Sequence, residues 1–177
     1  MPWEGLVRIL KYFKGTTGYG LRYGQKSKSN DFSGFVDASY GRCADTRRSR
    51  YGGIYMLNDG PVEWKLKMTQ IVALSSMEAE YISACVFVRV GVWLWRCLHE
   101  IGVRQENPTP LAPENKSSTS FANEAIIQNR SKHIDTRSNY VREKIIDGTT
   151  KLYFVPTKEM PADMLTKPIA AGPYGKF

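Results

Sequence analysis

Residues 72–85 read VALSSMEAEYISAC, and this stretch decides how the rest of the chain is interpreted. The pair Ser75-Ser76 follows a short apolar run and is typical of a helix start, because a hydroxyl oxygen can accept a hydrogen bond from a first-turn amide. Glu78 and Glu80 follow in the first turn, where the helix dipole favours negative charge. A long buried helix is predicted from Ser76 to about Ile101. Taken alone, two acids at a helix start are more often caps than catalytic groups.

The composition is that of a basic globular domain. The chain has 177 residues, of which 42% are hydrophobic, enough for the core of one domain. Its net charge is +8, and this balance favours a polyanionic partner such as nucleic acid. The cysteines form no CxxC pair and there are only two histidines, so a zinc site has little material and reduced thiols in an intracellular protein are expected.

Neither a secretory signal nor a membrane span is expected from the sequence. The start, MPWEGLVRILKYFKG, is basic and amphipathic without a long apolar core. The longest apolar run, 84–95, is interrupted by Arg89 and is too short to cross a bilayer. The sequence therefore predicts a soluble protein without a membrane partner.

The predicted elements alternate as in an α/β domain. An amphipathic helix over 3–14, a short strand at 19–23 and a polar linker precede the main body. Sequential antiparallel strands are expected at 32–40, 51–57 and 62–67, with a turn at Asn58–Pro61. After the long helix, the sequence predicts a strand at 109–112, helices at 117–127 and 135–147, a strand at 151–155 and a short helix from Pro161.

Acidic residues recur within or next to these elements. Asp37 lies in mid-strand, where a carboxylate is costly unless it is paired, exposed at an edge or bound to a cation. Glu114-Asn115 follow the fourth strand, at the kind of position where sites gather in an open α/β sheet. Asp163 begins the last helix. These positions are candidates for one shared site.

Five long motifs occur in a fixed order along the chain: VDAS (36–39), GPVEWK (60–65), VALSSMEAEY (72–81), SKHIDTRSNYVREK (131–144) and FVPTKEMPADMLTKP (154–168). Together they resemble the ribonuclease H domain that ends the Pol polyprotein of copia-type LTR retrotransposons. The resemblance implies a ribonuclease H-like α/β fold, in which a mixed five-stranded sheet has three antiparallel strands, then parallel additions, and flanking helices. It also implies a connecting arm from reverse transcriptase (1–30), the ribonuclease H-like domain (31–168) and a loose tail (169–177).

The same resemblance implies a metal-dependent endonuclease. In this family, four carboxylates hold two Mg²⁺ ions, for which Mn²⁺ can substitute, at the scissile phosphate of RNA paired with DNA. Hard carboxylate oxygens suit Mg²⁺, and so dense a group of acids repels itself without metal. Glu80 is favoured over Glu78 as the helix acid, because a small residue follows it three positions later and Glu78 lies on another helix face. The implied catalytic and metal-binding residues are Asp37, Glu80, Glu114 and Asp163, with Glu78 as the alternative.

Glu114 departs from the family pattern, which usually has Asp at this position, and Ser39-Tyr40 stand where the family usually has Asp-Trp. The extra methylene of Glu114 displaces the carboxylate, and catalytic geometry tolerates such shifts poorly. Two interpretations therefore stay open. One is a ribonuclease H, with activity impaired by Glu114; the other is a catalytically silent remnant that serves as a basic nucleic-acid-binding module.

The partners implied by the resemblance are an RNA–DNA hybrid and the reverse transcriptase of the same polyprotein, in cytoplasmic virus-like particles of the element. Recognition of the RNA strand is expected to rest on 2′-hydroxyl contacts and groove shape. His133, within the KHID motif, is expected to be structural. The candidate hybrid contacts are Arg47, Arg48, Lys65, Lys67, Asn115, Lys132 and Arg137.

Overall fold

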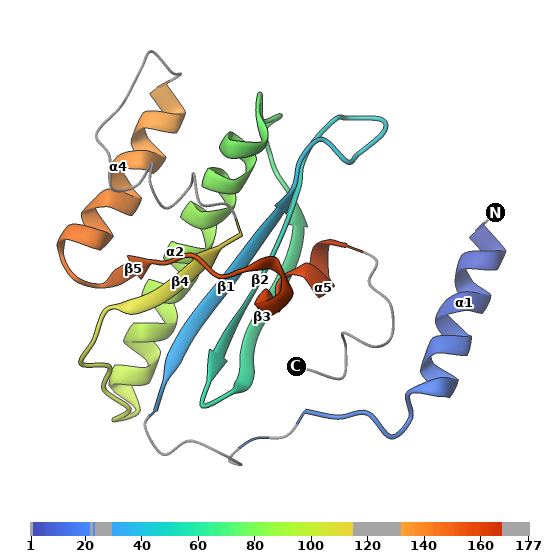
Figure 1. The fold of residues 1–177 in the computed structure, drawn as a ribbon, viewed down its shortest axis with the longest axis horizontal. Coiled ribbons are helices and arrows are strands. Elements are labelled where there is room, and N and C mark those ends of the chain that lie inside the picture. Colours follow the sequence, from blue (N-terminus) through green and yellow to red (C-terminus); the bar gives the residue numbers. More distant parts are fainter. Residues whose placement is uncertain (1, 22, 24–29, 115–131, 168–177) are drawn as a thin grey trace.

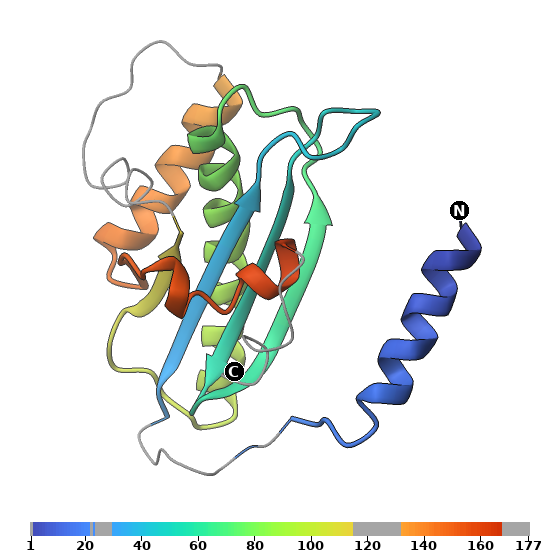
Figure 2. The ribbon, with the colours of Figure 1, turned by 45° about the vertical axis from the view of Figure 1, so that its right-hand side comes forward.

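The computed structural model describes residues 2–21, 23, 30–114 and 132–167. The elements in chain order are α1 (Pro2–Gly15), β1 (Phe32–Ser39), β2 (Arg50–Leu57), β3 (Gly60–Met68), α2 (Ser76–Glu100), β4 (Thr109–Pro113), α4 (Lys132–Ile146), β5 (Thr150–Leu152), the 3-10 turn η1 (Thr157–Glu159) and α5 (Asp163–Thr166). In Figure 1, α2 and α4 cover one face of the sheet, and α1 stands apart from it. Figure 2 shows the short helix α5 on the opposite face, across β1 and β2.

The strands form one mixed sheet in the order β3-β2-β1-β4-β5. The pairs β1–β2 and β2–β3 are antiparallel, whereas β1–β4 and β4–β5 are parallel. This arrangement confirms the predicted α/β fold with three antiparallel strands and parallel additions. Because β1 is the central strand, any side chain near its carboxyl end has a strand on each side.

The contact between α2 and the sheet is built around Tyr55 of β2, which is fully buried. Its hydroxyl donates a 2.7 Å hydrogen bond to the Phe87 carbonyl, and its ring stacks on Phe32 with centroids 5.0 Å apart. A Cβ at Gly34 or at Gly91 would overlap the Tyr55 ring. These glycines therefore make room for the tyrosine between strand and helix.

Helix α2 extends further than the apolar run on which the membrane argument rests. It has 25 residues and a mean hydropathy of 1.4 in its most apolar window, enough by length and composition to span a bilayer, but half of that window is buried inside the fold. The helix contacts β1, β2, β4 and α4. Packing in the domain core accounts for the buried half of this apolar stretch.

Two local predictions near the β2–β3 hairpin are wrong. Residues 19–21 and 23 form no strand; instead the Tyr23 hydroxyl donates a 2.7 Å hydrogen bond to the Pro61 carbonyl. The hairpin turn is also shorter than expected, because Asn58 and Asp59 alone take it, with φ of 51° and 64°. Two consecutive positive φ values match the twist of a tight hairpin, so β3 already begins at Gly60.

The C-terminal elements differ from expectation in their limits. Strand β5 ends at Leu152 rather than at residue 155, because the chain turns so that Val155 packs with Met160, Ala162 and Ala112 in a small second core. Helix α4 begins three residues earlier than predicted, and α5 begins at Asp163, two residues after Pro161. The predicted helix at 117–127 lies outside the described residues.

Replacing Gly91 by alanine should destabilise the fold by about 1–3 kcal/mol, because the new methyl group collides with Tyr55. Gly5→Ala is the matched control, since Gly5 also lies in a helix but has no atom within 4 Å of its Cβ position. That substitution should be neutral or stabilising by up to about 1 kcal/mol. Urea unfolding of both variants measures the difference; equal effects would contradict the packing described for Tyr55.

Candidate metal centre

Three carboxylates from separate elements meet at one end of the sheet. They belong to Asp37 of β1, Glu114 directly after β4, and Asp163 at the start of α5, and an oxygen of each lies within 4.8 Å of the others. The parallel register explains the first two, because Val36 pairs with Pro113 and the Glu114 amide donates to the Val36 carbonyl at 3.2 Å. Asp37 and Glu114 each follow that pair by one residue and so become neighbours.

Helix α5 brings the third carboxylate, and Gly52 of β2 lets it approach. Gly52 pairs with Asp37 in the sheet. A Cβ at Gly52 would lie 2.8 Å from Thr166 Cγ2 and 2.9 Å from Leu165 Cβ, closer than real contacts allow. The Thr166 hydroxyl donates to Asp37 Oδ2 and ties the helix to β1. Asp163 therefore reaches the site because Gly52, which has no side chain, is the residue of β2 that faces α5.

The start of α2 separates the roles of its two glutamates. Ser75 is the N-cap and accepts a 3.1 Å hydrogen bond from the Glu78 amide, while Glu78 Oε2 accepts a 2.8 Å bond from the Leu74 amide. Ser75 thus caps the helix, and Glu78 binds back to the residue before the cap. Glu80 is 6% exposed, and the charges of Asp37 and Glu114 add to the effect of burial in raising its pKa. The charges of Asp37 and Glu114 thus act on Glu80, but among the described residues Glu80 is not one of the acids whose oxygens lie within 4.8 Å of one another.

Burial and mutual repulsion shift the pKa values of these acids. Burial raises the pKa of Asp37 to about 7, and a hydrogen bond shared with Glu114 adds to the shift. Burial, followed by the charge of Asp37, raises the pKa of Glu80 to about 8. Burial also raises the pKa of Asp163. For Glu114 burial acts in the same direction, but hydrogen bonds from Asp37 and Lys167 outweigh it and lower its pKa. The cluster as a whole resists full ionisation without a cation.

Lys167 is a member of this cluster that the sequence analysis did not single out. Its Nζ lies 2.9 and 2.8 Å from the two oxygens of Glu114 and 2.9 Å from Asp163 Oδ1. It also lies 3.6 Å from Asp37 Oδ2. Burial lowers the pKa of Lys167, but hydrogen bonds to Glu114 and Asp163 outweigh it and raise the pKa. The available signal was the i,i+4 spacing between Asp163 and Lys167 at a helix start.

The residues present fit a divalent cation. Asp37 Oδ1 and Glu80 Oε2 are buried, and neither atom has a hydrogen-bond partner among the described residues. Buried carboxylate oxygens without donors are costly, and a metal ion is one way to satisfy them. Since every candidate ligand is a carboxylate, the donor set favours hard ions such as Mg²⁺ or Mn²⁺.

The predicted nucleic-acid contacts lie in several places. Lys67 and Arg137 line one cavity of about 450 Å³ together with Arg89, and Arg137 Nη1 is buried without a hydrogen-bond partner in the described part of the chain. Arg47 and Arg48 are exposed in the β1–β2 loop, at the same end of the sheet as Asp37, and Lys65 is half-buried on β3. Asn115 and the side chains of Lys132 and His133 lie outside the described residues.

The raised pKa of Glu80 predicts a pH effect on the metal-free protein. Its pKa is about 8 in the folded chain against an ordinary value of 4.5, so between these values the folded chain binds more protons and stability falls as pH rises. Glu80→Gln removes this loss. Its unfolding free energy relative to wild type should therefore increase between about pH 5 and 8, by at least about 1 kcal/mol.

Urea unfolding in EDTA measures this difference. The matched control is Glu78→Gln, the same substitution on the same helix, which keeps an acceptor oxygen for the Leu74 amide. A difference between Glu80→Gln and wild type that does not change with pH would contradict the assigned environment of Glu80.

Sequence comparison matches nearly the whole chain to retrotransposon polyproteins. It is 35% identical over 175 residues to the retrovirus-related Pol polyprotein from transposon TNT 1-94 of Nicotiana tabacum, covering 99% of this chain and 13% of that polyprotein. It is 28% identical over 175 residues to the Pol polyprotein from transposon RE2 of Arabidopsis thaliana, and the match covers 99% of this chain and 12% of that polyprotein. The chain thus spans a small part of these relatives. No family model matches it.

Structure comparison identifies the fold. LC11-RNase H1, isolated from compost, aligns with a TM-score of 0.57 at 10% identity, covering 77% of this chain and 92% of that chain. A structure of LC11-RNase H1 in complex with an RNA/DNA hybrid aligns with a TM-score of 0.51 at 9% identity, and the match covers 75% of this chain and 93% of that chain. Both comparisons confirm the predicted resemblance: the chain is homologous to the retrovirus-related Pol polyproteins of plant transposons and has the ribonuclease H fold.

Proposed function

We propose that this chain hydrolyses the RNA strand of RNA–DNA hybrids by a two-metal mechanism during reverse transcription of a retrotransposon. The observation that carries the proposal is the convergence of Asp37, Glu114 and Asp163 within 4.8 Å at the end of two parallel strands. Homology to Pol polyproteins supports the retrotransposon setting, and the hybrid bound to LC11-RNase H1 supports the substrate. The metal-binding and catalytic residues proposed are Asp37, Glu80, Glu114 and Asp163.

The chain's own part in this reaction is to hold and orient those carboxylates. Divalent ions bound there would activate the attacking water and stabilise the leaving 3′-oxygen. Asp37 is fully buried and fixed by Thr166, so its carboxylate has little freedom. The Thr157 hydroxyl donates to Glu114 Oε1 at 3.3 Å and orients the longer side chain toward Asp37. Glu114 thereby reaches the cluster despite its extra methylene.

Basic residues of the domain would hold the hybrid by its phosphates. The cavity lined by Lys67, Arg89 and Arg137 offers cationic donors, one of them buried without a partner in the described residues. Such contacts position a duplex without reading its sequence. Arg47, Arg48, Lys65, Asn115 and Lys132 complete the proposed set. The proposed setting is a cytoplasmic virus-like particle, with α1 and the residues up to 30 leading from reverse transcriptase.

A second candidate function is hybrid binding without cleavage. Glu114 stands where the resembling family usually has Asp, and both of its oxygens are already bonded to the Lys167 ammonium. An ion must displace this contact before it can use Glu114. If it cannot, the fold retains its phosphate contacts and loses its chemistry.

Cleavage of a labelled RNA–DNA hybrid in Mg²⁺ tests the proposed function. Asp37→Asn should reduce the rate at least about a hundredfold, because several kcal/mol of transition-state stabilisation depend on the bound ion. Glu80→Gln should have a similar effect. Glu78→Gln, which changes an acid of the same helix that binds back to the Leu74 amide, should cleave at a rate close to wild type.

Hybrid binding, measured on the same proteins in Ca²⁺, separates the two candidates. Binding without cleavage by the wild type in either Mg²⁺ or Mn²⁺ would reject the enzyme and support the binding module. In that case, cleavage gained by Glu114→Asp would identify the longer side chain as the cause.

A further inference from the structure

We propose that the Lys167 ammonium is a built-in substitute for the divalent cation: it neutralises the carboxylate cluster in the metal-free chain and must leave when an ion binds. This inference rests on the proposed metal site and adds a regulation of its loading. It makes Lys167 a positioning residue, which acts on the reaction only through the cluster.

The position of the ammonium supports this inference. The carboxylates that lie within 4.8 Å of one another belong to Asp37, Glu114 and Asp163. Lys167 Nζ contacts an oxygen of every one of them, at 3.6, 2.8 and 2.9 Å respectively. The single positive charge therefore lies among the same oxygens that would ligate a cation.

An ammonium and a divalent ion compete for the same oxygens here. Mg²⁺ needs its oxygen ligands at about 2.0–2.1 Å in near-octahedral order. Both oxygens of Glu114 already accept hydrogen bonds from Lys167, and Asp163 Oδ1 accepts a third. The lone pairs that accept these hydrogen bonds cannot also ligate an ion, and an ammonium that stays in place adds positive charge beside the incoming ion.

The Lys167 side chain can leave the cluster for solvent. Its side chain is 31% exposed, whereas that of Asp37 is fully buried. Its backbone amide donates a 2.9 Å hydrogen bond to the Asp163 carbonyl and closes α5 independently of the side chain. The side chain can therefore rotate into solvent while α5 keeps its cap.

Loss of the ammonium should have two opposite effects. Without metal, Glu114 and Asp163 lose their counter-charge, and α5 loses one of its ties to the sheet, so Lys167→Gln should melt at a lower temperature than wild type in EDTA. When Mg²⁺ is added, the variant has no Lys167 ammonium that competes with the ion. Lys167→Gln should then bind the first Mg²⁺ at least about tenfold more tightly, even if the charges interact as weakly as in bulk water.

Titration calorimetry with Mg²⁺ and thermal melting in EDTA or Mg²⁺ measure both effects. The control is Lys144→Gln, because Lys144 also bonds two carboxylates, Glu143 at 2.9 Å and Asp147 at 2.7 Å, but lies on α4 outside the cluster. Any loss in its melting temperature should be the same in EDTA and in Mg²⁺, with unchanged Mg²⁺ affinity. For Lys167→Gln the loss should appear in EDTA and shrink in saturating Mg²⁺.

Unchanged or weaker Mg²⁺ binding by Lys167→Gln would overturn the inference. If that variant does not fold, the ¹⁵N resonance of the wild-type Lys167 ammonium decides: it should change from a hydrogen-bonded to a solvent-exchanging signal as Mg²⁺ is added, and a signal that persists unchanged at saturation refutes the exchange.

Neither measurement uses cleavage. Hybrid cleavage with unchanged Lys167 behaviour would therefore reject this inference alone, whereas ion exchange without cleavage would reject the proposed function alone.

Discussion

Repulsion among buried carboxylates is the constraint on which the rest of this structure depends. Asp37 is fully buried in the central strand and Glu80 nearly so, and the pKa values of both are raised by burial. A buried carboxyl group of this kind either stays protonated or needs a cation that offsets its charge. In the chain itself that cation is Lys167, which lies between Glu114 and Asp163. The free energy that burial of these carboxylates costs is thus also what favours the binding of a metal ion there.

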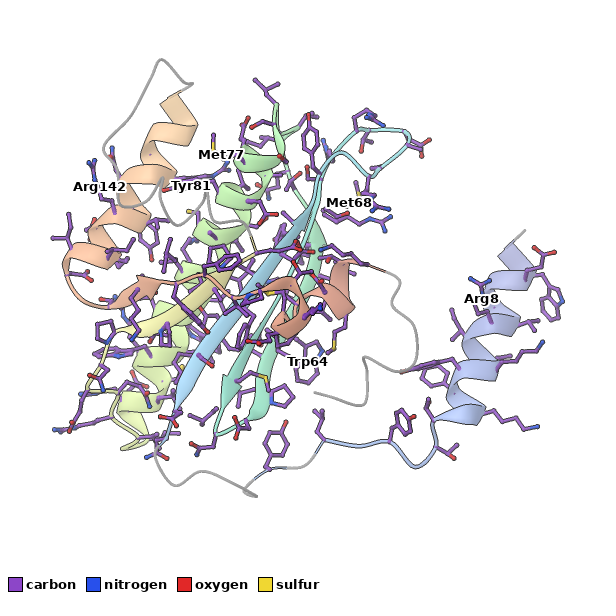
Figure 3. The ribbon with its side chains drawn as sticks, in the orientation of Figure 1. Arg8, Trp64, Met68, Met77, Tyr81 and Arg142 are labelled. Carbon is purple, nitrogen blue, oxygen red and sulfur yellow. The ribbon has the colours of Figure 1, made fainter. Side chains whose placement is uncertain are left out.

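The fold serves this cluster through backbone register and missing side chains. The parallel pairing of β1 with β4 places Asp37 beside Glu114, and Gly52 lets α5 lie close enough to add Asp163. On the opposite face, Tyr55 fixes α2 against the sheet. Figure 3 shows the side chains of both elements, with Tyr81 and Met77 near the start of α2 and Trp64 and Met68 on the edge strand β3. Elements far apart in sequence therefore position the cluster together.

The sequence predicted the elements well where local signals were strong and poorly where tertiary contacts decide. Ser75 and the apolar run after it gave the correct start and length of α2. Tyr23 was predicted to lie in a short strand, but its hydroxyl donates a hydrogen bond to the Pro61 carbonyl instead. Val155 continued an apolar run, yet it leaves the sheet for a separate core with Met160. Propensity alone cannot distinguish these outcomes, because both depend on residues distant in sequence.

The same limit applies to the site. A resemblance was enough to nominate the acids and to prefer Glu80, since motifs mark residue types and order. It did not reveal Lys167, whose importance arises only once Glu114 and Asp163 are brought to its ammonium by the fold. Nor could it show that the longer Glu114 side chain reaches Asp37, which follows from the register of β4 and from Thr157.

In the proposed mechanism, this carboxylate cluster binds divalent ions at an RNA–DNA hybrid. Anomalous diffraction from crystals of the protein with Mn²⁺ and a hybrid tests it most directly. We expect manganese peaks coordinated by Asp37, Glu80, Glu114 and Asp163 next to a phosphate of the RNA strand, with Lys167 turned away. A bound hybrid without manganese at these carboxylates, or with Lys167 still between Glu114 and Asp163, would contradict it.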